Sequence, residues 1–119
     1  MKYRLTDETR VVNGRTLHRI EKLEGGEKGG FIETEQNLSQ TGAAWVHPDG
    51  FAFENARVVE DGQVYGRVYG NAAIRGNAEI YGEAFGSCVI GDHVKIHGKA
   101  GGNAAVFGSD VVEQDKTIM

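Results

Sequence analysis

Between residues 52 and 115, small or aliphatic side chains alternate with polar, charged or aromatic ones, and the pattern returns every 16 residues. In each copy the even-numbered residues are the small or aliphatic ones, which is the period-2 pattern of a strand with one buried face. We therefore expect even-numbered side chains to point into a core and odd-numbered ones to point outward. The four copies are residues 52–67, 68–83, 84–99 and 100–115.

The inward positions form columns of similar residues when the copies are aligned. Two columns hold β-branched side chains and two hold mostly small ones, as expected for the wide and narrow parts of one interior. Cys88 lies in an alanine column, so we interpret it as a buried small residue rather than a nucleophile. The columns are Val58, Ile74, Ile90, Val106; Val64, Ile80, Ile96, Val112; Ala56, Ala72, Cys88, Ala104; and Ala52, Val68, Ala84, Ala100.

Glycine recurs where each copy is expected to bend, because bends often need backbone angles that other residues resist. The unit A-x-I-x-G-x occurs at 72–77 and again at 78–83, and each copy holds two such units and one four-residue wall. Three walls per copy predict an all-β fold, a single-stranded parallel β-helix of about four 16-residue triangular coils, stacked at the ~4.8 Å strand spacing. An antiparallel sandwich is the alternative, and turn signals every ~8 to 12 residues would be typical of it.

Outward charges alternate in sign along the predicted stack. One position holds Arg67, Glu83, Lys99 and Asp115 in successive copies, and another holds Glu79 and Lys95. Opposite charges on neighbouring strands favour this register. Each exposed pair contributes only ~0 to 1 kcal/mol, so the pattern specifies register more than stability.

The first third of the chain does not follow the repeat. Asn13-Gly14 separates two β-prone runs, which is the strongest short signal for a hairpin. A solenoid exposes unpaired strand edges at its ends unless something covers them. We therefore predict a β-hairpin and capping segment over residues 1–44, β-helix repeats over 45–115 and a short tail over 116–119.

Residues 29–39 read GGFIETEQNLS, and the repeats contain QVYG at 63–66 and EIYG at 79–82. These segments resemble those of a family of small phage and prophage proteins with hexapeptide-type repeats. The family's leader reads close to GGFIESEKNLS, which is matched here by residues 29–39, and its repeats read close to ARVYGN, matched at 63–66 and 79–82. The likeness covers nearly the whole chain. It departs at residues 48–51, where the first expected repeat is interrupted, and in the four-residue wall, which is shorter than the usual hexad.

This resemblance implies a fold more than an activity. The family's relatives resemble left-handed β-helix proteins and polymer-forming repeat proteins, so a left-handed coil and a phage origin are implied. Crossovers between parallel strands are nearly always right-handed, and only the resemblance argues for the left hand. Most members of the family have no assigned activity.

Composition narrows the classes of partner. The chain has 119 residues, 18 of them glycine, with 17 acidic and 13 basic side chains, and it has no basic run. Nucleic acid is therefore not an expected partner, because phosphate neutralisation needs a basic face. No apolar stretch approaches the ~20 residues of a membrane helix and the first residues lack a signal-peptide core, so we predict a cytoplasmic protein, in the host cell if phage-encoded.

Aromatic side chains are the most distinctive outward feature. Aromatic residues are enriched at interaction surfaces because they bury much area with few rotamers to fix. Stacked rings that only stiffen the coils are the alternative interpretation. We predict an exposed strip that binds a protein partner or a second copy of the chain, with a homo-oligomer favoured. Its columns flank one corner and consist of Phe53, Tyr69 and Phe85, and of Tyr65, Tyr81 and His97.

Catalytic and metal-binding hypotheses depend on histidines. Hexapeptide acyltransferases resemble one another in using a histidine base, for which His93 and His97 are candidates. A metal site would add His47, but the His-x3-His spacing suits a helix face, and no third ligand is fixed by the sequence. Histidines at the surface without such a role are the simpler interpretation.

No loop is inserted into the repeats to build a pocket. We therefore predict a non-catalytic interaction module without catalytic residues, metal or cofactor. Two alternatives stay open: a phage-encoded inhibitor of a host defence complex, with an anti-CRISPR-like role, and an acyltransferase-like enzyme.

Overall fold

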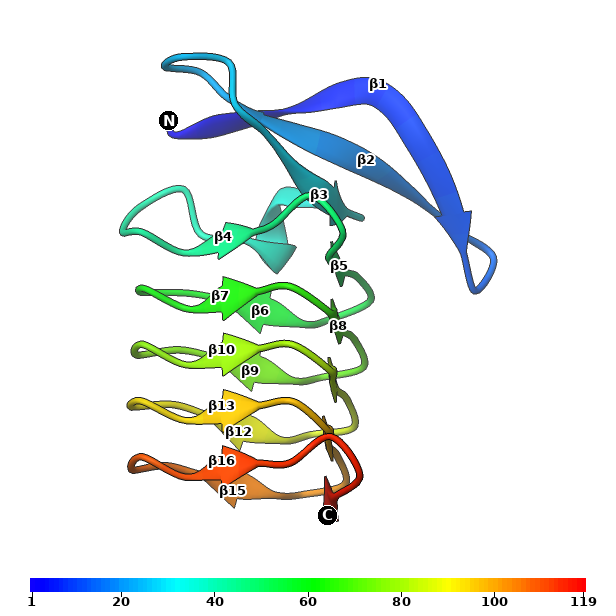
Figure 1. Ribbon diagram of the computed structural model, residues 1–119. Coiled ribbons are helices and arrows are strands. Elements are labelled where there is room, and N and C mark those ends of the chain that lie inside the picture. Colours follow the sequence, from blue (N-terminus) through cyan, green and yellow to red (C-terminus); the bar gives the residue numbers. More distant parts are fainter.

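The computed structural model describes residues 1–119 as a parallel β-solenoid whose coils stack below an N-terminal hairpin (Figure 1). Its only helix is the short 3₁₀ helix η1 (Glu35–Asn37). The strands are β1 (Tyr3–Val12), β2 (Arg15–Lys22), β3 (Lys28–Ile32), β4 (Trp45–Val46), β5 (Phe51–Ala52), β6 (Arg57–Val58), β7 (Gln63–Val64), β8 (Arg67–Val68), β9 (Ala73–Ile74), β10 (Glu79–Ile80), β11 (Glu83–Ala84), β12 (Val89–Ile90), β13 (Lys95–Ile96), β14 (Lys99–Ala100), β15 (Ala105–Val106), β16 (Val111–Val112) and β17 (Thr117–Ile118).

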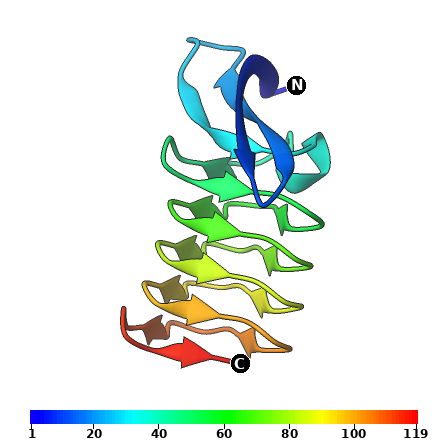
Figure 2. The ribbon, with the colours of Figure 1, turned by 90° about the vertical axis from the view of Figure 1, so that its right-hand side faces the viewer.

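Three sheets form the walls of the prism, and each predicted repeat contributes one strand to each wall. Wall A runs β3-β5-β8-β11-β14-β17, wall B runs β6-β9-β12-β15, and wall C runs β4-β7-β10-β13-β16. The hairpin β1–β2 adds to wall A in the antiparallel sense through β3. Figure 2 shows this hairpin lying across the N-terminal end of the stack. The predicted parallel β-helix is therefore confirmed.

The solenoid is longer than the repeat predicted. Wall A holds six stacked strands, so the chain makes about six turns rather than four. β3 lies in the segment predicted as a cap, yet Phe31 pairs with Phe51 in the parallel sense, and Leu38 bridges to Val58. β17 lies in the predicted tail and pairs with β14. The first coil escapes a search for a 16-residue period because two of its corners, between Leu38 and Trp45 and around Pro48, are longer than those of the repeats.

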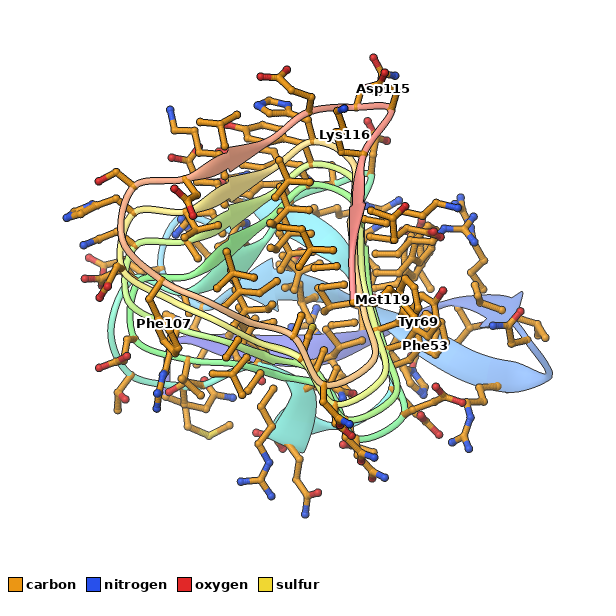
Figure 3. The ribbon with its side chains drawn as sticks, turned by 90° about the horizontal axis from the view of Figure 1, so that it is seen from below. Phe53, Tyr69, Phe107, Asp115, Lys116 and Met119 are labelled. Carbon is orange, nitrogen blue, oxygen red and sulfur yellow. The ribbon has the colours of Figure 1, made fainter.

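The coil is left-handed, as the resemblance implied. Figure 3 looks along the axis from the C-terminal end, and the chain runs clockwise from Phe107 through Asp115 to Met119 as it approaches the viewer. A path that turns clockwise while it approaches the viewer is a left-handed coil.

The predicted orientation of the side chains is confirmed along the repeats. Every residue of the four inward columns is buried, from fully buried Ile80 to Ala104 at 7% exposure. Ile80 pairs with Val64 on one side and with Ile96 on the other, so each inward residue stacks on its counterpart 16 residues away. Tyr3, Ile20 and Ile32 close the N-terminal end of this core.

Part of the predicted charge pattern forms ion pairs. Lys95 Nζ lies 3.9 Å from Glu79 Oε2, and Lys99 Nζ lies 3.6 Å from Glu83 Oε2. Arg67 forms no ion pair with Glu83, and its guanidinium lies 5.3 Å from the centre of the Phe51 ring instead. The exposed pairs contribute little to stability and act mainly on register.

Some corners use acidic residues where others use glycine. Glu54, Glu60 and Asp92 all have a left-handed backbone, with φ between 53° and 58°. Each carboxylate accepts a hydrogen bond from the backbone N–H of a glycine one coil further on, at 2.8 to 3.0 Å. The donors are Gly70, Gly76 and Gly108. The acids therefore satisfy corner N–H groups and offset part of the strain of their own backbone.

Candidate functional site

Four rings are stacked along one edge of wall C, and we call them the Tyr–His ladder: His47, Tyr65, Tyr81 and His97. Each ring follows directly after a strand of wall C, so the parallel register places one ring above the next. The ring centres are 4.0, 4.6 and 4.6 Å apart in that order, with interplanar angles of 10°, 5° and 5°. The faces of both tyrosine rings are covered by neighbours, while Tyr65 and Tyr81 remain 37% and 39% exposed.

His47 belongs to this ladder and was not among the residues predicted for the strip. Its ring stacks on Tyr65, and its Nε2 lies 2.6 Å from Oε1 of Gln63. The sequence separation from Tyr65 exceeds 16 residues because the corner around Pro48 is longer than the others. The signal that could have found it is its position directly after Trp45-Val46, the β-prone pair that precedes the corner.

Tyr81 is held from the side as well as from above and below. Its hydroxyl donates a short hydrogen bond to the carboxylate of Glu79, two residues earlier on the same outward face. This hydrogen bond, with smaller contributions from burial and from the Glu79 charge, raises the pKa of Tyr81 to about 12. The ladder is therefore a fixed array of ring edges and hydroxyl groups rather than a set of mobile side chains.

We expect replacement of Glu79 by glutamine to lower the pKa of Tyr81 toward its ordinary value of 10.0. The reason is that the variant lacks the carboxylate that accepts the hydrogen bond from the Tyr81 hydroxyl. The pKa is raised in the folded state, so this contact stabilises the fold below pH ~10, and its contribution is lost as the pH rises through about 12. The Tyr81 ring signal in an NMR pH titration measures the change. An unchanged pKa would contradict the contact.

The second predicted column is also stacked, but it is not fully exposed. Phe53, Tyr69 and Phe85 lie 5.2 and 5.7 Å apart in sequence order, with nearly parallel rings. The prediction that Phe53 is exposed is wrong, since its side chain is fully buried. Tyr69 and Phe85 are half-buried. Figure 3 shows Phe53 and Tyr69 together on the outer side of the wall that ends at Met119, facing the hairpin.

The β1–β2 hairpin covers Phe53. Leu17, Phe31, Phe51 and Phe53 form a separate apolar cluster outside the main core, with Val12 and Tyr69 packed against it. Arg15 at the start of β2 holds the hairpin in place through two ion pairs. Its Nη1 lies 2.8 Å from Glu33 Oε2, and its Nε lies 3.5 Å from Glu54 Oε2. The first half of this column is therefore part of the hairpin's docking surface and is not free to bind a partner.

The two aromatic columns do not form one continuous strip. Between Tyr65 and Tyr69 the chain places Arg67 at the start of β8, directly after the corner, and the same position holds Glu83 and Lys99 in the next coils. Lys99 and Glu83 form an exposed ion pair there. The predicted strip is therefore divided into the Tyr–His ladder on wall C and the hairpin cluster on wall A.

The structure does not bring the histidines together. His47 and His97 lie at opposite ends of the ladder with two tyrosine rings between them, and His93 is exposed after the corner at Asp92. No hydrogen bond joins His93 or His97 to a carboxylate that would orient it as a base. No group of three or more histidine, cysteine, aspartate or glutamate side chains is arranged to hold a metal ion.

Cys88 lies in the core, as its alanine column predicted, and burial raises the pKa of its thiol. We expect iodoacetamide to leave Cys88 unmodified in the folded protein and to modify it after unfolding, because the thiolate is the reactive form. The matched control is Ser87→Cys in a Cys88→Ala background, which moves the thiol to the exposed neighbouring position. Mass spectrometry measures both rates, and equal rates would show that position 88 is accessible.

The single short 3₁₀ helix is far from the length that a membrane-spanning helix needs, and the chain has no other helix. No protein-family model and no curated protein matches the chain.

Proposed function

We propose that this protein is a non-catalytic binding module that contacts a protein partner through the Tyr–His ladder. The observation that carries the proposal is the combination of exposure and rigidity at Tyr65 and Tyr81, whose rings are more than one third exposed yet stacked on both faces. Large amphipathic side chains that are already fixed lose little conformational freedom on binding.

Four hydrogen bonds hold the ladder and its neighbour Gln63 in place, which favours a role in binding over a role in stiffening the coils alone. Glu79 fixes the Tyr81 hydroxyl, and Gln63 fixes the ring of His47. Gln63 also donates hydrogen bonds from its side-chain amide to the backbone carbonyls of Ala43 and Asp61. Side chains that are pre-organised in this way resemble the rigid aromatic anchors of binding surfaces.

A photoreactive phenylalanine analogue in place of Tyr81 tests the proposal. We expect irradiation in an extract of the native host to join it to one protein. The same analogue in place of Val11 should give no such adduct, although Val11 is even more exposed, at 68%, on strand β1 of the hairpin. The absence of an adduct at position 81, or the same adducts at both positions, would contradict the proposal.

The partner found in this way permits a direct measurement of affinity. We expect the double change Tyr65→Ser and Tyr81→Ser to weaken binding by at least about tenfold, as for residues at the centre of an interface. Val11→Ser serves as the matched control and should leave the affinity unchanged. A double variant that stays folded by circular dichroism and binds normally would show that the ladder only stiffens the coils.

A further inference from the structure

The C-terminal end of the solenoid presents three unpaired strand edges. β15, β16 and β17 are the last strands of walls B, C and A, and each has a neighbour on one side only. Figure 3 looks onto this end, where Phe107, Lys116 and Met119 mark the last coil. Rows of free backbone groups pair readily with another strand.

The hydrogen bonds show which groups are free. The backbone N–H groups of Lys95 and His97 donate to the backbone carbonyls of Asp110 and Val112. These two hydrogen bonds lie on either side of Val111. The N–H and C=O of Val111 itself therefore point away from β13. The same pattern flanks Ala105 in β15, through Ala104 and Val106. It also flanks Thr117 in β17, through Lys116 and Ile118. Each terminal strand therefore offers one N–H and one C=O at its centre.

The opposite end of the solenoid is closed by side chains and by the hairpin. Lys2 Nζ donates to the Ala44 carbonyl at 2.7 Å, and the Tyr3 hydroxyl donates to the Leu38 carbonyl at 2.6 Å. The side-chain amide oxygen of Gln40 accepts hydrogen bonds from the N–H groups of Lys2 and Tyr3. A second copy therefore cannot stack head to tail on this end without displacing the hairpin.

We infer that two copies of this chain associate through their C-terminal ends, related by a two-fold axis that passes between the two Val111 residues. A rotation by 180° about an axis perpendicular to the solenoid axis changes neither the hand nor the pitch of the coil. The second copy can therefore continue the stack, with its strands antiparallel to those of the first copy. Val111 and Val111 of the second copy then exchange both backbone hydrogen bonds. Along the same seam, Ala105 lies opposite Thr117 of the second copy.

The side chains at this end fit such a seam. The outward column on wall C reads Gln63, Glu79 and Lys95, and then ends in Val111, which is 50% exposed. The two-fold axis brings two valines together at that position, whereas a charge there would meet its own copy. Antiparallel pairing also places Ser109 opposite Glu113 and Phe107 opposite Asp115, so no two like charges face one another across the seam.

Analytical ultracentrifugation over a range of concentrations tests the inference. We expect the mass to rise from monomer to dimer and to stop there, because a two-fold interface is closed. Val111→Pro removes an N–H that no contact within one copy uses, and we expect it to weaken the dimer at least about tenfold while the fold persists by circular dichroism. Val111→Thr keeps the N–H and should dimerise like the wild type.

A charge pair gives a second test that does not depend on the backbone of the variant. Val111→Lys and Val111→Glu should each be monomeric alone, because like charges meet at the axis, and an equal mixture of the two should dimerise. The inference is overturned if the wild type stays monomeric or grows beyond a dimer, if folded Val111→Pro still dimerises, or if the mixture stays monomeric. The Tyr65→Ser and Tyr81→Ser double variant should dimerise normally, so the ladder and the seam are tested separately.

Discussion

Replacement of Gly82 by alanine should destabilise the solenoid strongly, although Gly82 does not have a left-handed backbone. A Cβ at this position would overlap the backbone carbonyl oxygen of Gly98 in the next coil and lie 2.6 Å from that of His97. The obstacle is backbone in every direction, so no side chain can move aside. We expect a loss of about 3 kcal/mol or more, at the upper end of the ~1 to 3 kcal/mol typical of overpacked sites.

Urea denaturation monitored by circular dichroism measures this loss, and Gly26→Ala is the matched control. Gly26 has φ of 71°, and no other atom lies within 4 Å of the position that a Cβ would take, so alanine there meets only the backbone preference. That preference costs ~1 to 2 kcal/mol. If Gly82→Ala costs no more than Gly26→Ala, the coils are not packed as closely at this corner as the structure indicates.

The corner glycines show how far the sequence alone could go. The repeat correctly placed glycine at the corners, but it attributed every glycine to backbone angle. In the structure the Gly70 and Gly86 column does have positive φ, whereas Gly66 and Gly82 are needed because neighbouring coils approach closely. Close approach between coils is a property of the stacked structure, and no local pattern reports it.

The repeat predicted the direction of side chains better than their surroundings. Phe53 has an odd number and was therefore predicted to point outward, and its side chain does lie outside the main core. Its burial comes from Leu17 and Phe31 in the segment that does not repeat, so no periodicity could have shown it. His47 was missed for a related reason, since the longer corner around Pro48 moves it out of the 16-residue frame while the strand register still brings it onto Tyr65.

The repeat did not predict the last strand of wall A. Asp110 and Gln114 place polar side chains at inward positions of the last copy, and residues 116–119 were predicted to be a tail, but β17 still joins wall A at residues Thr117–Ile118. Strand pairing depends on backbone groups that every residue carries, so it continues where the side-chain pattern has already faded. The family resemblance, the phage origin and the interaction role stay predictions, and the experiments on the ladder and on the seam address the last of them.

Ile80→Asp should abolish folding. Ile80 is fully buried between Val64 and Ile96 in the middle of the stack, where a carboxylate would have apolar neighbours and no exposure to solvent. An unpaired charge in such a place costs several kcal/mol, in addition to the ~2 to 5 kcal/mol that a large-to-small substitution costs in a packed core. That sum is comparable with the ~5 to 15 kcal/mol total stability of a typical domain.

Two controls separate the charge from other effects of changing this strand. Ile80→Val keeps the apolar packing and should cost only ~0.5 to 1.5 kcal/mol. Glu79→Gln changes the adjacent outward residue, and it should cost less than about 1 kcal/mol because its ion pair with Lys95 and its hydrogen bond from the Tyr81 hydroxyl are both exposed. Circular dichroism and urea denaturation measure all three variants. If Ile80→Asp and Glu79→Gln had equal effects, the assignment of even-numbered residues to the interior would be wrong, and with it the register that aligns the Tyr–His ladder.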